Sequence, residues 1–317
     1  MEYKLLGNTG IKVSYFCFGV LPMGPLQANI SPEEGGALLK KAYAKGINFI
    51  DTAQMYKTYP HIKESLKGLK DEDIVIASKS GASDYKGMEE AIHEALRELD
   101  RNYIDIFHLH SAKSKENVFT EKAEALRCLL DYKEKGLIKA VGISTHNVEV
   151  VEKAALHPDI DVVFPIINQP GFGIINGNTE DMLKAISLCE EKDKGLYAMK
   201  ILAGGNLVGD IINAFDYAKN IKEMSSLAIG MINDRELDFN LKLFNNEIIS
   251  EDMIPQCKNN KKMILLPNNC IKCRKCMAMC PNDAIYVEND IMKIDDSKCL
   301  LCGYCSTVCP EFAIRMI

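Results

Sequence analysis

Four ionisable side chains stand at the ends of short apolar runs. The run INFID ends at Asp51, with Tyr56 five residues on, VIASK ends at Lys79, and YIDIFHLH ends at His110. A lysine near a tyrosine lowers the pKa of the phenol, and an aspartate keeps that lysine charged and in place. A neutral histidine beside them donates a hydrogen bond that orients a carbonyl group. Together the four residues predict reduction of a carbonyl, or the reverse oxidation of an alcohol.

A second group of reactive side chains lies near the C-terminus, where eight of the twelve cysteines fall in two runs. The runs CIKCRKCMAMCP and CLLCGYCSTVCP both follow the spacing C-x2-C-x2-C-x3-C-P, and the second begins 29 residues after the first. Zinc sites usually pair two short C-x-x-C units around a longer loop and close with four ligands. This spacing therefore favours iron–sulfur clusters over zinc.

The two runs resemble those of bacterial ferredoxins with two clusters, in which the fourth cysteine of each run ligates the other cluster. The resemblance implies two [4Fe-4S] clusters, held in a crossed arrangement. One set would be Cys270, Cys273, Cys276 and Cys309, and the other Cys299, Cys302, Cys305 and Cys280.

Composition limits the class of protein further. The chain has 317 residues, 47% of them hydrophobic and 26% charged, with a net charge of -6. An acidic chain of this kind argues against a nucleic-acid partner, and it has no apolar run of about 18 residues that could span a membrane. Cysteine-rich runs without a secretory leader indicate a reducing compartment, so we expect a cytoplasmic protein.

The first 245 residues alternate short apolar runs with amphipathic segments. Nearly continuous apolar runs are typical of parallel strands buried on both faces. The absence of a Gly-x-Gly-x-x-Gly turn weakens the alternative of a doubly wound sheet. We therefore predict an α/β fold, a (β/α)₈ TIM barrel. The expected strands are Tyr15–Val20, Ile47–Asp51, Ile74–Ser78, Ile104–Leu109, Ala140–Ser144, Val162–Ile167, Leu196–Met199 and Leu227–Ile229, and the clearest helices are Pro32–Lys45, Met88–Leu99 and Lys122–Lys135.

From the N-terminus to about Asn240 the chain resembles the aldo-keto reductase family. The opening MEYKLLGNTGIKVS is similar to the family's first hairpin, and DTAQMY, VIASK, YIDIFHLH and GLIKAVGIST match its motifs on successive strands. The resemblance implies that Asp51, Tyr56, Lys79 and His110 are the catalytic tetrad, with Tyr56 as general acid. His108 is expected to support the site or fill the barrel.

The resemblance also implies an NAD(P)H site, for which Ser144, Asn168 and Met199 are the expected contacts of the nicotinamide. In SLAIGMINDRELDFN, Ile232 and Glu236 occupy the places where the family carries basic residues for the 2′-phosphate. A carboxylate repels a phosphate, so NADH is favoured over NADPH.

The sequence thus predicts a barrel (1–245), a linker (246–262) and a small ferredoxin-like α+β domain (263–317). Three functions remain open. The barrel reduces a small carbonyl compound with NAD(P)H, or the clusters pass electrons from a redox protein partner to a flavin or substrate, or the barrel is a non-catalytic scaffold for an electron carrier. An intact tetrad disfavours the third.

Overall fold

Eight parallel strands close into a barrel in the order β10-β3-β4-β5-β6-β7-β8-β9. The computed structural model describes residues 1–250, 252–254, 262–311 and 313–316. The prediction of a TIM barrel is therefore confirmed, and a doubly wound sheet is excluded. The barrel strands are β3 Phe16–Gly19, β4 Phe49–Asp51, β5 Val75–Ser80, β6 Ile104–His110, β7 Ile138–Thr145, β8 Val162–Pro165, β9 Gly195–Ala198 and β10 Ser226–Gly230.

Each barrel strand falls within or across a predicted run. Strand β8 ends at Pro165, short of the predicted Ile167, and an isolated bridge between Ile166 and Met199 follows it. A hairpin of β1 Tyr3–Leu5 and β2 Lys12–Ser14 precedes the barrel, as expected.

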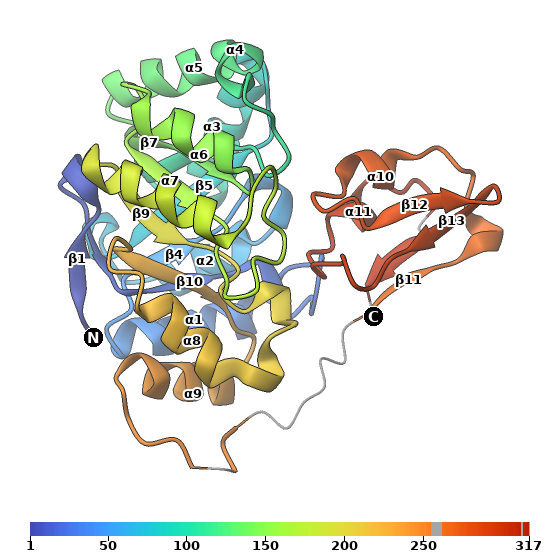
Figure 1. The fold of residues 1–317 in the computed structure, drawn as a ribbon. Helices are drawn as coiled ribbons and strands as arrows, with labels where there is room; N and C mark the ends of the chain where they lie inside the picture. The colour runs from blue at the N-terminus through green and yellow to red at the C-terminus, as the bar shows by residue number, and fades with distance from the viewer. Residues whose placement is uncertain (251, 255–261, 312, 317) are drawn as a thin grey trace.

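Helices surround the barrel (Figure 1). Helix α1 begins where predicted, because the hydroxyl of Ser31 accepts a hydrogen bond from the Glu34 amide and Glu34 bonds back to the Ser31 amide. It stops before Gly46, whose φ of 91° lies in the left-handed region. The helices are α1 Pro32–Ala44, α2 Tyr59–Leu66, α3 Tyr85–Leu99, α4 Val118–Glu121, α5 Ala123–Glu134, α6 Val148–Leu156, α7 Thr179–Glu191, α8 Ile211–Lys219 and α9 Asp234–Phe244.

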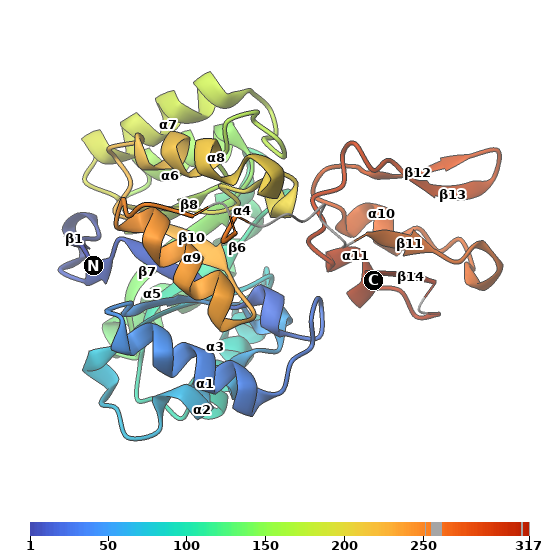
Figure 2. The same ribbon diagram turned by 90° about the horizontal axis from the view of Figure 1, so that it is seen from below.

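The cysteine-rich tail (residues 262–316) is a small α+β unit beside the barrel (Figures 1 and 2). Two antiparallel pairs, β11 with β14 and β12 with β13, enclose a core of its own. Residues 255–261 of the predicted linker, including Cys257, lie outside the described residues. The tail contains β11 Met263–Leu265, α10 Lys275–Met279, β12 Ile285–Glu288, β13 Ile291–Ile294, α11 Tyr304–Thr307 and β14 Ile314–Met316.

None of the helices in the described ranges has both the length and the apolar content of a membrane span.

Candidate active site and cysteine cavities

The four predicted catalytic residues meet at the carboxyl ends of three neighbouring strands. Asp51 ends β4, Lys79 lies near the end of β5, and His110 ends β6. Tyr56 follows in the short 3-10 helix η3, Gln54–Tyr56, immediately after β4. The parallel register brings these strand ends to one edge of the barrel, which is where barrel enzymes carry their active sites.

Asp51 and Lys79 form a buried ion pair. The Nζ atom of Lys79 donates hydrogen bonds to both carboxylate oxygens of Asp51 at 2.7 Å and to the Thr52 carbonyl oxygen at 2.6 Å. Burial raises the pKa of Asp51 and lowers that of Lys79, and each residue opposes the shift of the other. The three donors of the ammonium group are therefore used within this pair and its backbone.

This geometry corrects the expectation that the pKa of Tyr56 is lowered. Burial raises that pKa well above its usual value, and the neighbouring Tyr304 and Asp51 raise it further. Lys79 contacts the aromatic face instead, with Nζ 5.1 Å from the ring centroid. The Tyr56 hydroxyl thus keeps its proton at neutral pH and can donate it.

His110 stands beside Tyr56, with the two rings edge to face and their centroids 6.1 Å apart. Burial, together with the positive charges of Lys79 and Lys200, lowers the pKa of His110 well below its usual value. The ring is therefore neutral at neutral pH, as the sequence analysis predicted, and can exchange hydrogen bonds without carrying charge.

A fifth side chain reaches this site from the tail. The hydroxyl of Tyr304, the first residue of α11, lies 3.0 Å from the Tyr56 hydroxyl oxygen and 3.3 Å from Nε2 of His110. Tyr304 is only 5% exposed and packs against Leu26 and Ala53 of the barrel. An oxygen of the tail is therefore placed between the two groups that are expected to hold a carbonyl oxygen.

Beneath the tetrad, His108 and Tyr197 form a second polar layer. The Tyr197 hydroxyl lies 3.0 Å from Oδ2 of Asp51 and 2.7 Å from Nε2 of His108. A Cβ on Gly142 would stand 2.2 Å from the His108 ring, so the glycine makes room for it. His108 supports the site from inside the barrel, as expected, and Tyr197 had not been recognised from the sequence.

The expected nicotinamide contacts differ in what they offer a ligand. Ser144 pairs with His110 across β6 and β7, and its buried hydroxyl has no hydrogen-bond partner within the described residues. A ligand carboxamide fits such an orphaned group. The Asn168 side chain is already bonded to the backbone of Phe172 and Lys200. Met199 lies at the end of β9, partly buried against the core.

The carboxylate of Glu236 is engaged in local hydrogen bonds in the first turn of α9. It accepts hydrogen bonds from the Ile232 amide at 2.8 Å and from the Asn233 side chain at 3.1 Å. The positive end of a helix that a phosphate could use thus carries a carboxylate. The residues fit the nicotinamide end of a dinucleotide at Ser144 and do not fit a phosphate at Glu236.

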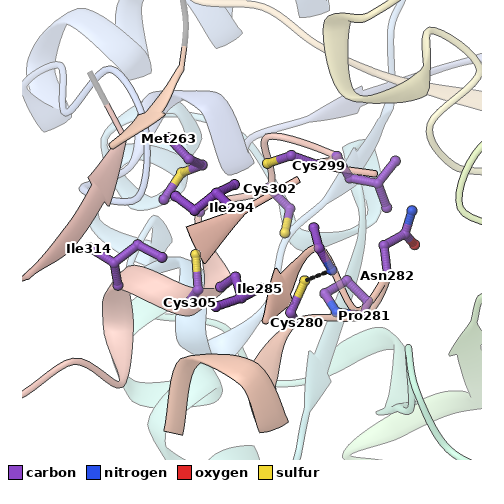
Figure 3. A pocket seen from close by; sticks show the side chains of 13 residues that line it. Met263, Cys280, Pro281, Asn282, Ile285, Ile294, Cys299, Cys302, Cys305 and Ile314 are labelled. Atoms are coloured by element: carbon purple, nitrogen blue, oxygen red, sulfur yellow. Dashed lines mark hydrogen bonds between the residues drawn. The ribbon is translucent and has the colours of Figure 1, made fainter. Parts of the chain in front are cut away.

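The eight cysteines of the tail separate into two cavities. Figure 3 shows the first, which has a volume of about 360 Å³. Four cysteines line it: Cys280, Cys299, Cys302 and Cys305. The Sγ atom of Cys280 also accepts a hydrogen bond from the Ala284 amide at 3.3 Å, drawn as a dashed line. Cys280 is therefore placed with the cysteines of the other run.

The second cavity, of about 330 Å³, is lined by Cys270, Cys273, Cys276 and Cys309. No three ligand side chains in the described part of the chain are grouped for a single metal ion. Each cavity is lined by four cysteine side chains, the donors that iron–sulfur clusters require. The residues present therefore fit one [4Fe-4S] cluster in each cavity, in the crossed arrangement.

The second cysteine loop (residues 299–309) is the part of the tail that docks on the barrel. Leu300 is 3% exposed and belongs to the hydrophobic core of the barrel. A Cβ on Gly204 would stand 2.1 Å from the Leu300 carbonyl oxygen, and one on Gly303 would stand 2.7 Å from that of Leu26. Glycine at both positions permits this close approach of backbone to backbone.

Lys200 brings a positive charge to this contact. Its Nζ atom lies 2.9 Å from Nε2 of His146 and 5.7 Å from the centroid of the Tyr304 ring. Burial lowers the pKa of Lys200 and Cys302 raises it, whereas burial raises the pKa of Cys302 and Lys200 lowers it. No carboxylate within the described residues forms an ion pair with Lys200, and the groups that favour its charged form are Cys302 and Cys280.

Sequence reasoning missed Tyr304, Lys200 and Tyr197. Tyr304 could have been found by aligning the two cysteine runs, because it stands where the first run has Lys275. An aromatic residue in the second run where the first run has a lysine indicates that the second loop packs against another part of the protein.

An eight-stranded barrel with this tetrad, joined to a unit with two four-cysteine cavities, defines a class of iron–sulfur oxidoreductase. The model of the aldo/keto reductase family matches residues 16–247, and that of the 4Fe-4S dicluster domain matches residues 269–313. The chain belongs to the aldo/keto reductase family and carries a 4Fe-4S dicluster domain at its C-terminus. Both resemblances seen in the sequence are thereby confirmed.

Curated relatives and solved structures agree on the barrel. The chain is 28% identical to L-galactose dehydrogenase of Arabidopsis thaliana over 220 residues, covering 65% of this chain and 67% of the relative. It is 25% identical to methylglyoxal reductase DkgA of Escherichia coli over 190 residues, covering 57% and 67%. An aldo-keto reductase structure from Pseudomonas aeruginosa aligns with a TM-score of 0.65 at 25% identity, covering 76% of this chain and 93% of that one.

Proposed function

We propose that this protein reduces an aldehyde or ketone, or oxidises the corresponding alcohol, at the mouth of the barrel. The observation that carries the proposal is the convergence of Tyr56 and His110 on a single oxygen atom, now that of Tyr304. A substrate carbonyl oxygen in that place would meet a proton donor and a neutral imidazole. The same class of chemistry is named for the relatives L-galactose dehydrogenase and methylglyoxal reductase.

In this proposal Tyr56 is the general acid. Its raised pKa keeps the phenol protonated until negative charge develops on the carbonyl oxygen, which then takes the proton. The buried ammonium of Lys79 lies over the Tyr56 ring and stabilises the phenolate left behind. Asp51 fixes Lys79, and His110 orients the carbonyl.

A nicotinamide bound near Ser144 and Met199 would supply the hydride, and NADH is favoured because Glu236 leaves no place for a 2′-phosphate. Two [4Fe-4S] clusters in the crossed cysteine sets complete the cofactors. We place the boundaries of the barrel at 1–245, of the linker at 246–262 and of the iron–sulfur domain at 263–317 as part of this proposal.

A second function is supported by the docking of the second cysteine loop. Cys302 is packed against a hydrophobic group that contains Tyr56 and Tyr304. A cluster held there would lie against the barrel mouth, as a ferredoxin-linked reductase requires, with a flavin as the alternative cofactor. The first cysteine loop (residues 270–280), with Lys272, Arg274 and Lys275, would then face a redox protein partner.

Anaerobic calorimetry of the cluster-loaded protein with NADH and then NADPH separates the two functions. Micromolar binding of NADH with weaker binding of NADPH supports the first, and binding of neither moves the assignment to the second, with flavin as the next ligand.

Turnover tests the catalytic assignment itself. We expect Tyr56→Phe to lower carbonyl reduction by roughly 10²–10⁴-fold while the visible spectrum of the clusters stays unchanged. Tyr132→Phe, on the outer helix α5, is the matched control. Unchanged turnover in Tyr56→Phe would remove this residue from the mechanism.

A further inference from the structure

The phenol of Tyr304 has the position and the contacts of a ligand. Its oxygen lies within hydrogen-bonding distance of Tyr56 and His110, and its ring stands edge-on to His110 with the centroids 5.7 Å apart. The ring is also 5.7 Å from the Nζ atom of Lys200. Two polar contacts and a buried aromatic surround are what a protein offers a small bound molecule.

The rest of the second cysteine loop holds this side chain in place. Leu300 lies in the core of the barrel, and the side chain of Asn206 donates a hydrogen bond to the Cys299 carbonyl at 3.4 Å. Lys113 of the barrel forms an ion pair with Asp283 of the tail. The contacts of Cys299 and Leu300, together with the ion pair of Asp283, therefore hold the loop against the barrel mouth.

We propose that Tyr304 is a specificity-determining residue of the active site, because its hydroxyl occupies the place of the substrate carbonyl oxygen. Tyr56 and His110 cannot both hold that hydroxyl and a carbonyl oxygen in the same position. A carbonyl compound is turned over only if it displaces Tyr304 from these two groups. This inference rests on the proposed function for its reference to substrate, and on the contacts of the Tyr304 hydroxyl with Tyr56 and His110 for its geometry.

Displacement has a measurable consequence for affinity. When only a fraction of the molecules has an open site, the apparent dissociation constant rises in proportion to the reciprocal of that fraction. Removing the Tyr304 hydroxyl takes away two hydrogen bonds that hold the site closed, while the loop keeps its other contacts. Substrate affinity should then rise without a change in the chemical step.

The sharpest test replaces the side chain by a free molecule of the same shape. We expect Tyr304→Ala, which removes the hydroxyphenyl ring and keeps Cβ, to leave a cavity that binds phenol, as engineered apolar cavities bind small aromatic molecules. Benzene, which lacks the hydroxyl, should bind roughly tenfold more weakly, because the hydrogen bonds to Tyr56 and His110 are lost. Wild-type protein and Tyr286→Ala, which truncates an exposed tyrosine of the same domain, should bind neither.

Anaerobic calorimetry of the three cluster-loaded proteins with each of the two ligands measures these affinities without any turnover. Binding of phenol that shows no preference over benzene, or no binding to Tyr304→Ala, would overturn the inference. If Tyr304→Ala loses its clusters, the test is instead the rate of amide hydrogen exchange in Tyr304→Phe. We expect the amides of residues 299–305 and 54–56 to exchange at least fivefold faster in Tyr304→Phe, with residues 270–276 unchanged, and equal rates would contradict the proposal.

Kinetics then separate specificity from structure. With benzaldehyde as the carbonyl probe and NADH as donor, Tyr304→Phe should lower KM roughly tenfold and leave kcat little changed. A purely structural role would lower kcat and cluster content together. If no variant turns over benzaldehyde, the proposed function fails, and the phenol result still decides whether Tyr304 is a displaceable occupant.

Discussion

The two cysteine loops have the same ligand spacing and opposite surroundings. In the first loop Ile271 is 61% exposed, and Arg274 and Lys275 also face solvent. In the second loop the residues at the corresponding positions are Leu300, Gly303 and Tyr304, and all are buried against the barrel. The comparison teaches that the cysteines decide what each loop binds, whereas the residues between them decide where it docks.

The backbone of the two loops is alike at the decisive position. Arg274 and Gly303 both lie in the left-handed region, with φ of 60° and 78°. Only Gly303 meets another chain segment there, at the Leu26 carbonyl. The turn needed for ligation is thus available to either residue, and the absence of a side chain at Gly303 serves the contact with the barrel.

The largest effect that could break this comparison is the loss of a single cluster. We expect Cys280→Ala to remove or perturb the cluster of the docked loop, because Cys280 lines its cavity, and Cys309→Ala to perturb the exposed one. Iron counting and EPR of the two variants measure this directly. If Cys280→Ala affected only the cluster held by Cys270, Cys273 and Cys276, ligation would not be crossed.

A substitution that gives the second loop the residue of the first tests docking itself. Gly303→Arg should displace the loop, since even a Cβ at this position would stand 2.7 Å from the Leu26 carbonyl oxygen. We expect faster hydrogen exchange in residues 299–305 and retained clusters. Arg274→Gly, the reciprocal variant, is the control. Unchanged exchange in Gly303→Arg would show that the contact with the barrel is not tight.

Acidification should destabilise the barrel through the buried histidines near its mouth. Burial lowers the pKa of His108, His110 and His146 well below the usual value, so the folded protein resists their protonation. Below a pH of about 6.5 the unfolded chain takes up these protons first, and the free energy of unfolding falls by up to about 1.4 kcal/mol per pH unit for each histidine. Anaerobic urea unfolding at pH 7.5 and pH 5.5 measures the loss. Equal stability at both values would mean that these rings are solvated.

The smallest expected effect concerns charge beside the clusters. Lys200→Met removes the partly buried cation next to Cys302 and should make the reduction potential of the docked cluster more negative, because less positive charge then stabilises the added electron. Lys275→Met, on the exposed loop, should change the reduction potential of the cluster in that loop by a smaller amount, because solvent screens the charge of Lys275. EPR-monitored potentiometry distinguishes the two clusters. Equal shifts would remove Lys200 as the counter-charge.

Local patterns in the sequence were enough to predict the barrel and the two cysteine sets. Apolar runs and helix caps such as Ser31 act over a few residues, and the spacing of the cysteines within each run is enough to indicate iron–sulfur ligation. The contact between Tyr56 and Tyr304 spans 248 positions of the chain and depends on docking, so no local pattern contains it. The pKa of Tyr56 was predicted in the wrong direction for a related reason, because burial raises it and the contact with Tyr304 raises it further.

The covalent connection between α9 and β11 gives the docking contact a further meaning. Because Tyr304 belongs to the same chain as Tyr56, it never diffuses away from the barrel mouth. A tethered group of this kind acts at an effective concentration in roughly the millimolar range. A free carbonyl compound must compete with that concentration, so a weak metabolite present at micromolar levels would be excluded and only an abundant or tightly bound one would be admitted.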